Sequence, residues 1–114
     1  MQDKVMTNPK IEKKPGCVAG ALSIMGNKWT ALLIMELAKG SRRFCALEDS
    51  LEGISPRTLS QRLDDLEEKS VITKKKYAEV PPRVEYKLTK KGEDLIPILR
   101  SMATWGDKYS SKKT

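Results

Sequence analysis

The chain has 114 residues, of which 22 are Lys or Arg and 15 are Asp or Glu, giving a formal net charge of +7. This length fits one domain, and 39% hydrophobic with 32% charged residues is typical of a globular chain rather than a disordered one. The absence of His excludes His-dependent acid–base catalysis, Ser-His and Cys-His nucleophile pairs and imidazole-bound zinc. The basic balance favours a polyanionic partner such as nucleic acid, and a merely solubilising surface is the alternative.

The two cysteines are too few for a four-thiolate metal site or for a disulfide-stapled secreted scaffold. Residues 1–16 lack the apolar core of a signal peptide. The longest near-apolar run, residues 29–37, is about half a membrane span. We therefore expect a cytoplasmic protein with free thiols at Cys17 and Cys45, and with no metal, no cofactor and no membrane contact.

The chain divides into three parts by composition. Residues 1–15 are polar and lack periodicity, so they are predicted to form a flexible N-terminal arm. Residues 16–109 are predicted to form one folded domain, and residues 110–114 a polar C-terminal tail.

Four helices are predicted in the first part of this domain. Apolar periodicity indicates a helix over residues 17–25, then a second over 28–39 that is apolar on nearly all sides and therefore central. Apolar residues at i, i+3 and i+7 predict a short third helix over 44–51. Ser55 as N-cap, followed by a proline at the first helical position, begins a fourth helix that ends at about Lys69.

A β-hairpin and a last helix follow. Residues 71–77 and 84–88 are predicted to form two antiparallel strands, joined by a turn whose two prolines keep it out of the sheet. Thr89 caps a final helix over residues 90–109, in which Pro97 predicts a kink or a missing hydrogen bond. The expected fold is mainly α with a small β-hairpin.

The order of these elements is typical of a winged helix-turn-helix. A short helix, a four-residue break containing glycine and a capped amphipathic helix make the helix-turn-helix pattern. That spacing is a weak signal alone, because many helical bundles show it. Residues 73–90 carry six basic and two acidic residues, a net charge of +4, so the hairpin that follows is a basic wing and makes the combination more specific.

The fourth predicted helix has a buried stripe and a polar outer face. Leu59, Leu63 and Leu66 lie within about 40° of one another at 100° per residue. The polar side chains of the first two turns suit base edges and phosphates, whereas the acidic residues of 64–68 repel phosphates, so only the N-terminal half should enter a major groove. The alternative is a solvated amphipathic helix. The candidate DNA-contacting residues are Ser55, Arg57, Thr58, Ser60, Gln61 and Arg62.

The hairpin supplies a second set of candidates. Arg83 lies at the tip beside two prolines, where a guanidinium can reach a narrow A·T minor groove. Lysines are better placed for phosphates, which add salt-dependent affinity without reading sequence. Strand residues alternate between faces, so some of these lysines only cover surface. The candidate phosphate contacts are Lys74, Lys76, Lys87 and Lys90.

Five parts of the chain match one known family: Cys17, GNKWTALLIMEL (26–37), RRFCAL (42–47), GISPRTLSQRLDDLEE (53–68) and YAEVPPRVEYKLTKKG (77–92). They resemble the HxlR-type winged helix-turn-helix family of bacterial transcriptional regulators. The resemblance implies a homodimeric DNA-binding regulator. It implies a recognition helix at about 55–69, a wing at about 78–85, and a dimer interface made by the N- and C-terminal helices.

The last predicted helix supports a dimer independently, because it carries two apolar stripes. One stripe would cover the chain's own core and leave the other exposed, and large exposed apolar stripes are usually buried against another subunit. Alternatively, both stripes wrap one core. A two-fold dimer would bind an inverted-repeat operator, with the recognition helix in the major groove and the wing at the minor groove. The candidate interface residues are Leu22, Ile98, Met102, Trp105 and Tyr109.

Cys17 is a candidate redox or electrophile sensor. The resemblance implies this role, because some family members sense through a cysteine at the start of the first helix; a helix N-terminus favours a thiolate. Val18 stands where the family often has Pro, and the alternative is a small residue without a sensing role. Cys45 is expected to pack against the protein interior.

For the whole chain, the alternative function is a winged-helix protein-interaction module without specific DNA binding. An enzyme is not expected.

Overall fold

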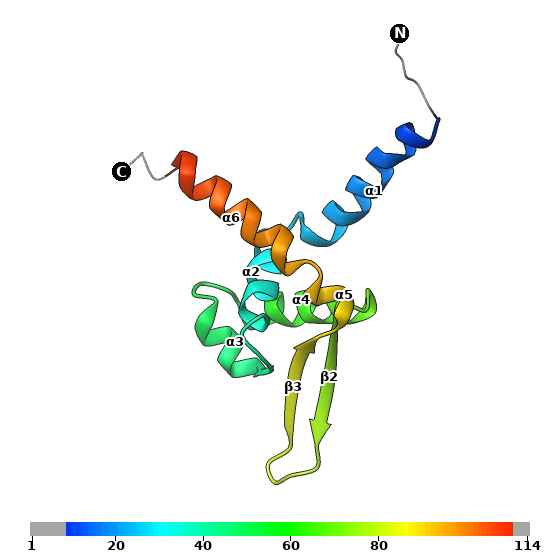
Figure 1. The fold of residues 1–114 in the computed structure, drawn as a ribbon. Helices are drawn as coiled ribbons and strands as arrows, with labels where there is room; N and C mark the ends of the chain where they lie inside the picture. Colours follow the sequence, from blue (N-terminus) through cyan, green and yellow to red (C-terminus); the bar gives the residue numbers. More distant parts are fainter. Residues whose placement is uncertain (1–8, 111–114) are drawn as a thin grey trace.

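The computed structural model describes residues 9–110, with side chains from Cys17 onward. Three strands form one antiparallel sheet in the order β1-β3-β2. A central body carries the β2-β3 hairpin at one end and α1 and α6 at the other (Figure 1). This confirms the predicted fold, mainly α with a small β-hairpin. The elements are α1 (Pro9–Met25), α2 (Lys28–Leu37), β1 (Arg42–Arg43), α3 (Phe44–Ser50), α4 (Pro56–Glu68), β2 (Ile72–Tyr77), β3 (Arg83–Leu88), α5 (Lys90–Glu93) and α6 (Ile96–Ser110).

The core is one apolar cluster centred on α2, as its nearly all-round apolar sequence predicted. Asn27 caps this helix, because its Oδ1 accepts the Trp29 N–H at 2.9 Å. Leu33 and Ile34 are inaccessible to solvent. Helices α3, α4 and α6, the residue after α3 and the base of the hairpin pack around them through Leu47, Leu51, Leu59, Leu63, Leu66, Val71, Ile72, Leu88 and Leu99.

Helix α1 begins earlier than the sequence pattern indicated. Residues 9–15, predicted to belong to a flexible arm, continue the helix of Cys17, whereas residues 1–8 and 111–114 lie outside the described part of the chain. The polar sequence hid this helix, and the Pro15-Gly16 pair inside it is unfavourable for helix formation. The first helix therefore begins at Pro9 rather than at residue 17.

The last predicted helix is two helices. The break falls at Asp94 and Leu95, before Pro97, and not as a kink at the proline itself. Pro97 is the second residue of α6, where its missing N–H costs little because the first N–H groups of a helix have no intrahelical partner. The proline therefore starts a helix rather than distorting one.

Strand β1 was not predicted. It has only two residues, and Arg42 pairs with Tyr86 while Arg43 pairs with Glu85 of β3. So short a strand has no periodicity that a sequence pattern could reveal. It places two arginines at the edge of the wing sheet.

No single helix in residues 9–110 is both long and apolar enough to cross a membrane. Cys17–Met25 and Lys28–Leu37 reach that length and composition only together, across a bend of 80°. The second of these segments forms the centre of the core.

Gly92 is required where α5 meets the base of the wing. A Cβ there would overlap the Val71 carbonyl oxygen and lie 3.0 Å from Leu88 Cδ2. That carbonyl also accepts the Thr89 N–H at 3.0 Å, so it is not free to move.

Gly92→Ala is expected to lower the free energy of unfolding by about 1–3 kcal/mol through overpacking, measured by urea denaturation.

Gly20→Ala is the matched control. Gly20 is exposed in α1 with no atom within 4 Å of an added Cβ. It should leave stability unchanged or raise it by up to about 1 kcal/mol through helix propensity. Equal effects of the two substitutions would contradict the packing described for Gly92.

Candidate nucleic-acid interface

Helix α4 presents a polar outer face at its N-terminal half. Ser55 caps the helix as predicted: its Oγ accepts the Thr58 N–H at 3.1 Å and donates to Thr58 Oγ1 at 3.0 Å. The hydroxyls of Ser55 and Thr58 are thus engaged with each other at the helix start. Arg57, Ser60 and Gln61 are exposed, and Arg62 is half-buried. The first two turns therefore display one cation and two uncharged polar side chains.

The acidic second half of α4 is partly neutralised. Lys69 Nζ lies 3.2 Å from Asp65 Oδ2, and Lys74 Nζ lies 3.7 Å from Glu67 Oε1. The second pair joins α4 to strand β2, so it ties the orientation of the wing to that of the helix. Lys74, predicted to contact phosphate, is therefore also an ion-pair partner of α4.

The strand register divides the predicted basic residues of the wing between two faces. Lys74 pairs with Tyr86 and Lys76 with Val84, whereas Lys87 pairs with Thr73. Side chains alternate along a strand and opposed residues share a face, so Lys74 and Lys76 lie on one face and Lys87 on the other. Arg83 shares the Lys87 face.

Tyr86 identifies which face lies against α4. Burial raises the pKa of its phenol above 10.0, Lys74 lowers it, and Asp64 and Glu67 of α4 raise it. These neighbours place Tyr86 and Lys74 on the α4 side of the ribbon. Lys76 is thus a second exposed lysine on the α4 side of the ribbon, and no ion pair of its side chain is found among the described residues.

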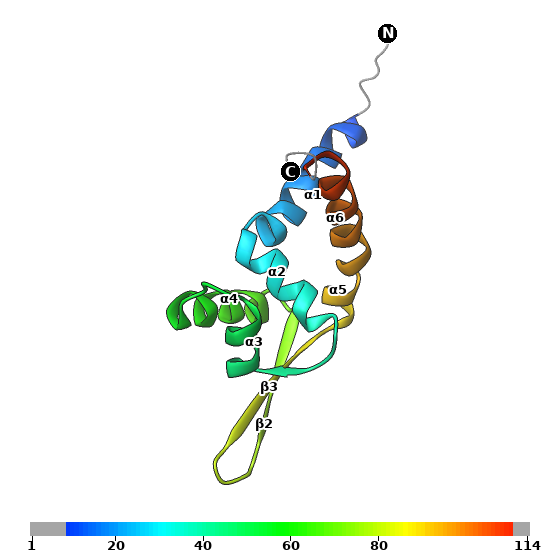
Figure 2. The same cartoon turned by 90° about the vertical axis from the view of Figure 1, so that its left-hand side faces the viewer.

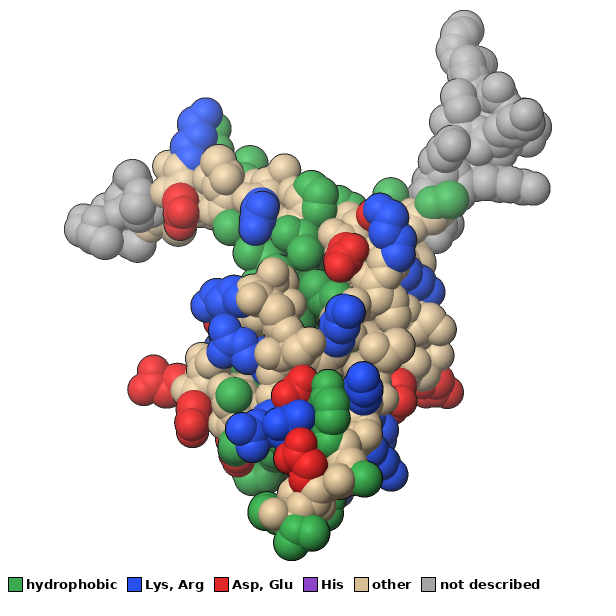
Figure 3. All heavy atoms as spheres, turned by 60° about the horizontal axis from the view of Figure 1, so that its bottom comes forward, with side chains coloured by type: hydrophobic (Ala, Val, Ile, Leu, Met, Phe, Trp, Pro, Cys, Tyr) green, Lys and Arg blue, Asp and Glu red, His purple; other side chains and the backbone are tan. Residues whose placement is uncertain are grey.

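Arg83 is held within the wing rather than extended from its tip. Its Nη2 lies 3.1 Å from Glu79 Oε2, its Nε lies 3.5 Å from Glu85 Oε2, and its Cζ lies 4.1 Å from the Tyr77 ring centroid. The fully exposed residue at the tip is the apolar Val80. Figure 3, which views the wing end of the molecule, shows acidic side chains interleaved with the basic ones.

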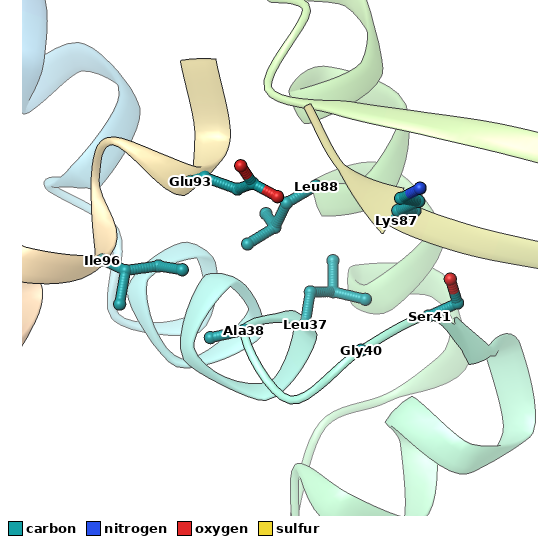
Figure 4. A pocket seen from close by; sticks show the side chains of 8 residues that line it. All are labelled: Leu37, Ala38, Gly40, Ser41, Lys87, Leu88, Glu93 and Ile96. Carbon is teal, nitrogen blue, oxygen red and sulfur yellow. The ribbon is translucent and has the colours of Figure 1, made fainter. Parts of the chain in front are cut away.

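Lys90 lies away from the wing strands, at the start of α5. Its Nζ lies 2.9 Å from Asp94 Oδ1, and this hydrogen bond raises the Lys90 pKa. The remaining predicted phosphate contact, Lys87, borders a hollow of about 490 Å³ between α2, β3 and α5. In Figure 4, Leu37 and Leu88 lie between Lys87 and Glu93 in this hollow. Lys87 and Lys90 are therefore separated from the surface that Lys76 shares with α4.

Sequence reasoning missed Arg42 and Arg43. Strand pairing brings them to the edge of the wing, where Arg43 lines a hollow together with Pro82 and Arg83. Two adjacent arginines before a helix were the available signal, but their position beside the hairpin depends on the unpredicted strand β1.

The predicted interface residues form exposed apolar faces on α1 and α6. Trp105 is 67% exposed, and its ring centroid lies 5.1 Å from that of Tyr109. Leu99, on the opposite apolar stripe of α6 from Trp105, packs into the core. Both helices extend away from the body, as Figure 2 shows from the side. The exposed set contains the five predicted residues Leu22, Ile98, Met102, Trp105 and Tyr109, and adds Val18.

Both cysteine thiols are free and exposed. Because α1 begins at Pro9, Cys17 lies about two turns inside the helix and not at its N-terminus. The expectation that Cys17 stands at the start of the first helix is therefore wrong. Cys45 was expected to pack, which is wrong: it is exposed in the first turn of α3 and lines the hollow beside Arg83.

Comparisons with known proteins agree with this geometry. The HxlR-like helix-turn-helix family profile matches residues 24–114. A helix-turn-helix transcriptional regulator of Methanothermobacter thermautotrophicus is 41% identical over 91 residues, 80% of this chain and 70% of its own length. The redox regulator HypR in its reduced form has a TM-score of 0.78 at 31% identity, covering 85% of this chain and 98% of its own. The reduced transcriptional regulator YodB of Bacillus subtilis has a TM-score of 0.72 at 31% identity, covering 92% and 96%.

Proposed function

Because this chain belongs to the HxlR-like helix-turn-helix family of transcriptional regulators, we propose that it binds DNA sequence-specifically, as a cytoplasmic homodimer on an inverted-repeat operator. The observation that carries the proposal is the geometry of α4. Its leucine face is locked in the core while Arg57, Ser60 and Gln61 are exposed on its first two turns. A helix presented in this way is what major-groove recognition requires.

The three exposed polar side chains in the first two turns of α4 each have a DNA partner in this proposal. Arg57 suits the O6 and N7 atoms of guanine, Gln61 suits N6 and N7 of adenine, and Ser60 suits either a base or a phosphate. Ser55 and Thr58 hold the helix start, and Arg62 is the phosphate contact on the helix flank. These contacts lie on the half of α4 that lacks acidic residues.

The wing would position the protein on DNA through phosphate contacts and would add one minor-groove contact. Lys76 and Lys74 lie on the α4 side of the ribbon and would bind phosphates of the same DNA segment. Arg83 is the minor-groove residue. Lys87 and Lys90 would bind phosphates farther along the duplex.

The α1 and α6 faces are proposed to bury each other's apolar residues across a two-fold axis. A monomer would leave Trp105, Tyr109 and Met102 exposed on α6, and Leu22 and Val18 exposed on α1. Exposed apolar sets of this kind mark subunit interfaces. A two-fold axis would place the recognition helices about 34–36 Å apart, one DNA turn.

Cys17 is proposed to couple oxidants or electrophiles to this dimer. Its thiol is exposed and lies on a helix of the proposed interface, next to Val18. The similar protein HypR is described as a redox regulator. Modification at Cys17 would change the packing of α1 against the partner and so the spacing of the recognition helices.

The alternative of a protein-interaction module rested on the acidic half of α4. Asp65 and Glu67 pair with lysines of this chain, which reduces the acidic surface that a basic partner could bind. The geometry therefore favours DNA over a basic protein as the partner.

The DNA-binding proposal is tested by selection from a random-sequence duplex library followed by fluorescence anisotropy. The wild-type protein should enrich an inverted repeat and bind it at least about 10³-fold more tightly than random duplex. Arg57→Ala should lose about 1–3 kcal/mol of binding free energy and relax specificity at one position per half-site. Arg100→Ala, an exposed arginine of α6, is the control and should keep wild-type affinity. Failure to enrich any sequence would contradict the function, and wild-type binding by Arg57→Ala would contradict its assigned role.

The dimer proposal is tested by sedimentation equilibrium. Trp105→Glu places a charge on the exposed stripe of α6 and should give a folded monomer, because the side chain makes no contact with the core. Arg100→Glu, on another face of the same helix, should remain a dimer. A monomeric wild-type protein at micromolar concentration, or a dimeric Trp105→Glu protein, would refute this interface.

The sensing proposal is tested by treating the purified protein with diamide and glutathione and measuring binding to the selected duplex. The Cys17 thiol and the glutathione thiol form a mixed disulfide, and diamide takes up the two hydrogens. The wild-type affinity should change by tenfold or more (about 1.4 kcal/mol), and reduction with dithiothreitol should restore it. Cys17→Ser should not respond, while Cys45→Ser should respond like the wild type. The idea fails if diamide leaves wild-type binding unchanged or if Cys17→Ser still responds.

A further inference from the structure

Arg83 is shared by two carboxylates of the wing. Glu79 contacts the outer nitrogen Nη2 at 3.1 Å, and Glu85 lies 3.5 Å from the inner nitrogen Nε. The Tyr77 ring covers the guanidinium at 4.1 Å, and its hydroxyl donates to Glu85 Oε1 at 3.4 Å. Only 28% of the Arg83 side chain is exposed. Arg83, Glu79 and Glu85 together carry a net charge of −1, and Lys75, whose Nζ lies 5.1 Å from the Tyr77 ring centroid, brings the cluster to zero. The wing tip therefore has no basic excess.

The two carboxylates occupy different positions. Glu85 belongs to β3, opposite Lys75, and its side chain is 26% exposed. Its carboxylate lies within ion-pair distance of Arg83 Nε, a buried atom that makes no hydrogen bond within the described residues, so the contact is electrostatic. Glu79 belongs to the connection between the strands and is 46% exposed. Glu85 therefore holds the inner part of the arginine against the ribbon, whereas Glu79 occupies the outer nitrogen that DNA would approach.

Resting on the proposed DNA binding, we infer that Glu85 and Glu79 act on Arg83 in opposite directions. Glu85, supported by the Tyr77 hydroxyl, is a positioning residue that keeps the guanidinium aligned along the wing. Glu79 is a competitor, which DNA must displace before Arg83 Nη2 can enter the minor groove. A half-exposed ion pair is weak enough for such an exchange.

Glu79 and Glu85 carry identical charges but should affect DNA binding differently. General repulsion between carboxylates and phosphates would make the loss of either one tighten DNA binding by a similar factor. Competition and positioning predict opposite signs. Removing the Glu79 carboxylate frees Arg83 Nη2 for DNA. Removing the Glu85 carboxylate leaves Arg83 Nε without its ion-pair partner, so the Arg83 side chain loses its fixed direction.

The test compares Glu79→Gln with Glu85→Gln, which remove one charge each and keep side-chain shape. Dissociation constants are measured by fluorescence anisotropy on the duplex that the wild-type protein selects from a random library. Glu79→Gln should bind about two- to five-fold more tightly, and Glu85→Gln should bind about two- to five-fold more weakly. Tightening by both substitutions, or no change with Glu79→Gln, would overturn the inference.

Two further variants keep the result interpretable. In an Arg83→Ala background, Glu79→Gln should no longer change the affinity, and a persistent tightening would show that charge alone acts. Tyr77→Phe removes the hydroxyl bound to Glu85 without changing charge, so it should weaken binding even if Glu85→Gln does not fold; unchanged binding would contradict the positioning role.

The inference and the proposed function fail in different ways. If the wild-type protein selects no duplex from the library, the proposed function is wrong. If it selects one and binds it specifically, but the two glutamate variants change affinity in the same direction, only the roles of Glu79 and Glu85 are wrong.

Discussion

The packing of one leucine stripe determines the geometry of the whole candidate interface. Leu59, Leu63 and Leu66 of α4 are almost inaccessible in the core around α2, so α4 has one rotational setting. Each buried leucine contributes on the order of 1.5–3 kcal/mol, more than the exposed side chains could offset by rotating the helix. Val71, buried immediately after α4, accepts the Thr89 N–H and anchors both wing strands to the same core. The outer face of α4 and the base of the wing are therefore placed relative to each other before any DNA binds.

Charge is distributed less simply than the net value of +7 indicates. The basic excess of the hairpin lies along its strands and on both faces, whereas the tip combines Arg83 with two glutamates. Salt-dependent affinity would then come from the strand lysines, and the tip would add a contact that depends on exchange of an internal ion pair. The strands and the tip of the wing would therefore contribute to DNA affinity in different ways. The net charge alone does not show this difference.

Local signals in the sequence predicted most of the fold and the central part of the site. The Ser-Pro pair at the start of α4 and its leucine spacing predicted both the cap and the buried face, because both depend on neighbours within a few residues. Strand β1 and the contacts of Arg83 could not be predicted, since they depend on strand register, which pairs Tyr77 with Arg83. The start of α1 was hidden because a polar segment containing a proline has no helical signal.

The most direct test of the account is to locate α4 on DNA. An iron chelate attached at Gln61→Cys, in a chain whose Cys17 and Cys45 are replaced by Ser, cleaves the duplex near that residue. A dimer that reads DNA with the N-terminal half of α4 should give two clusters of major-groove cuts about one DNA turn apart. A chelate at Glu68→Cys, at the acidic end of the same helix, should cleave much more weakly. Equal cleavage from both positions, or a single cluster of cuts, would contradict a dimer that reads DNA with the N-terminal half of α4.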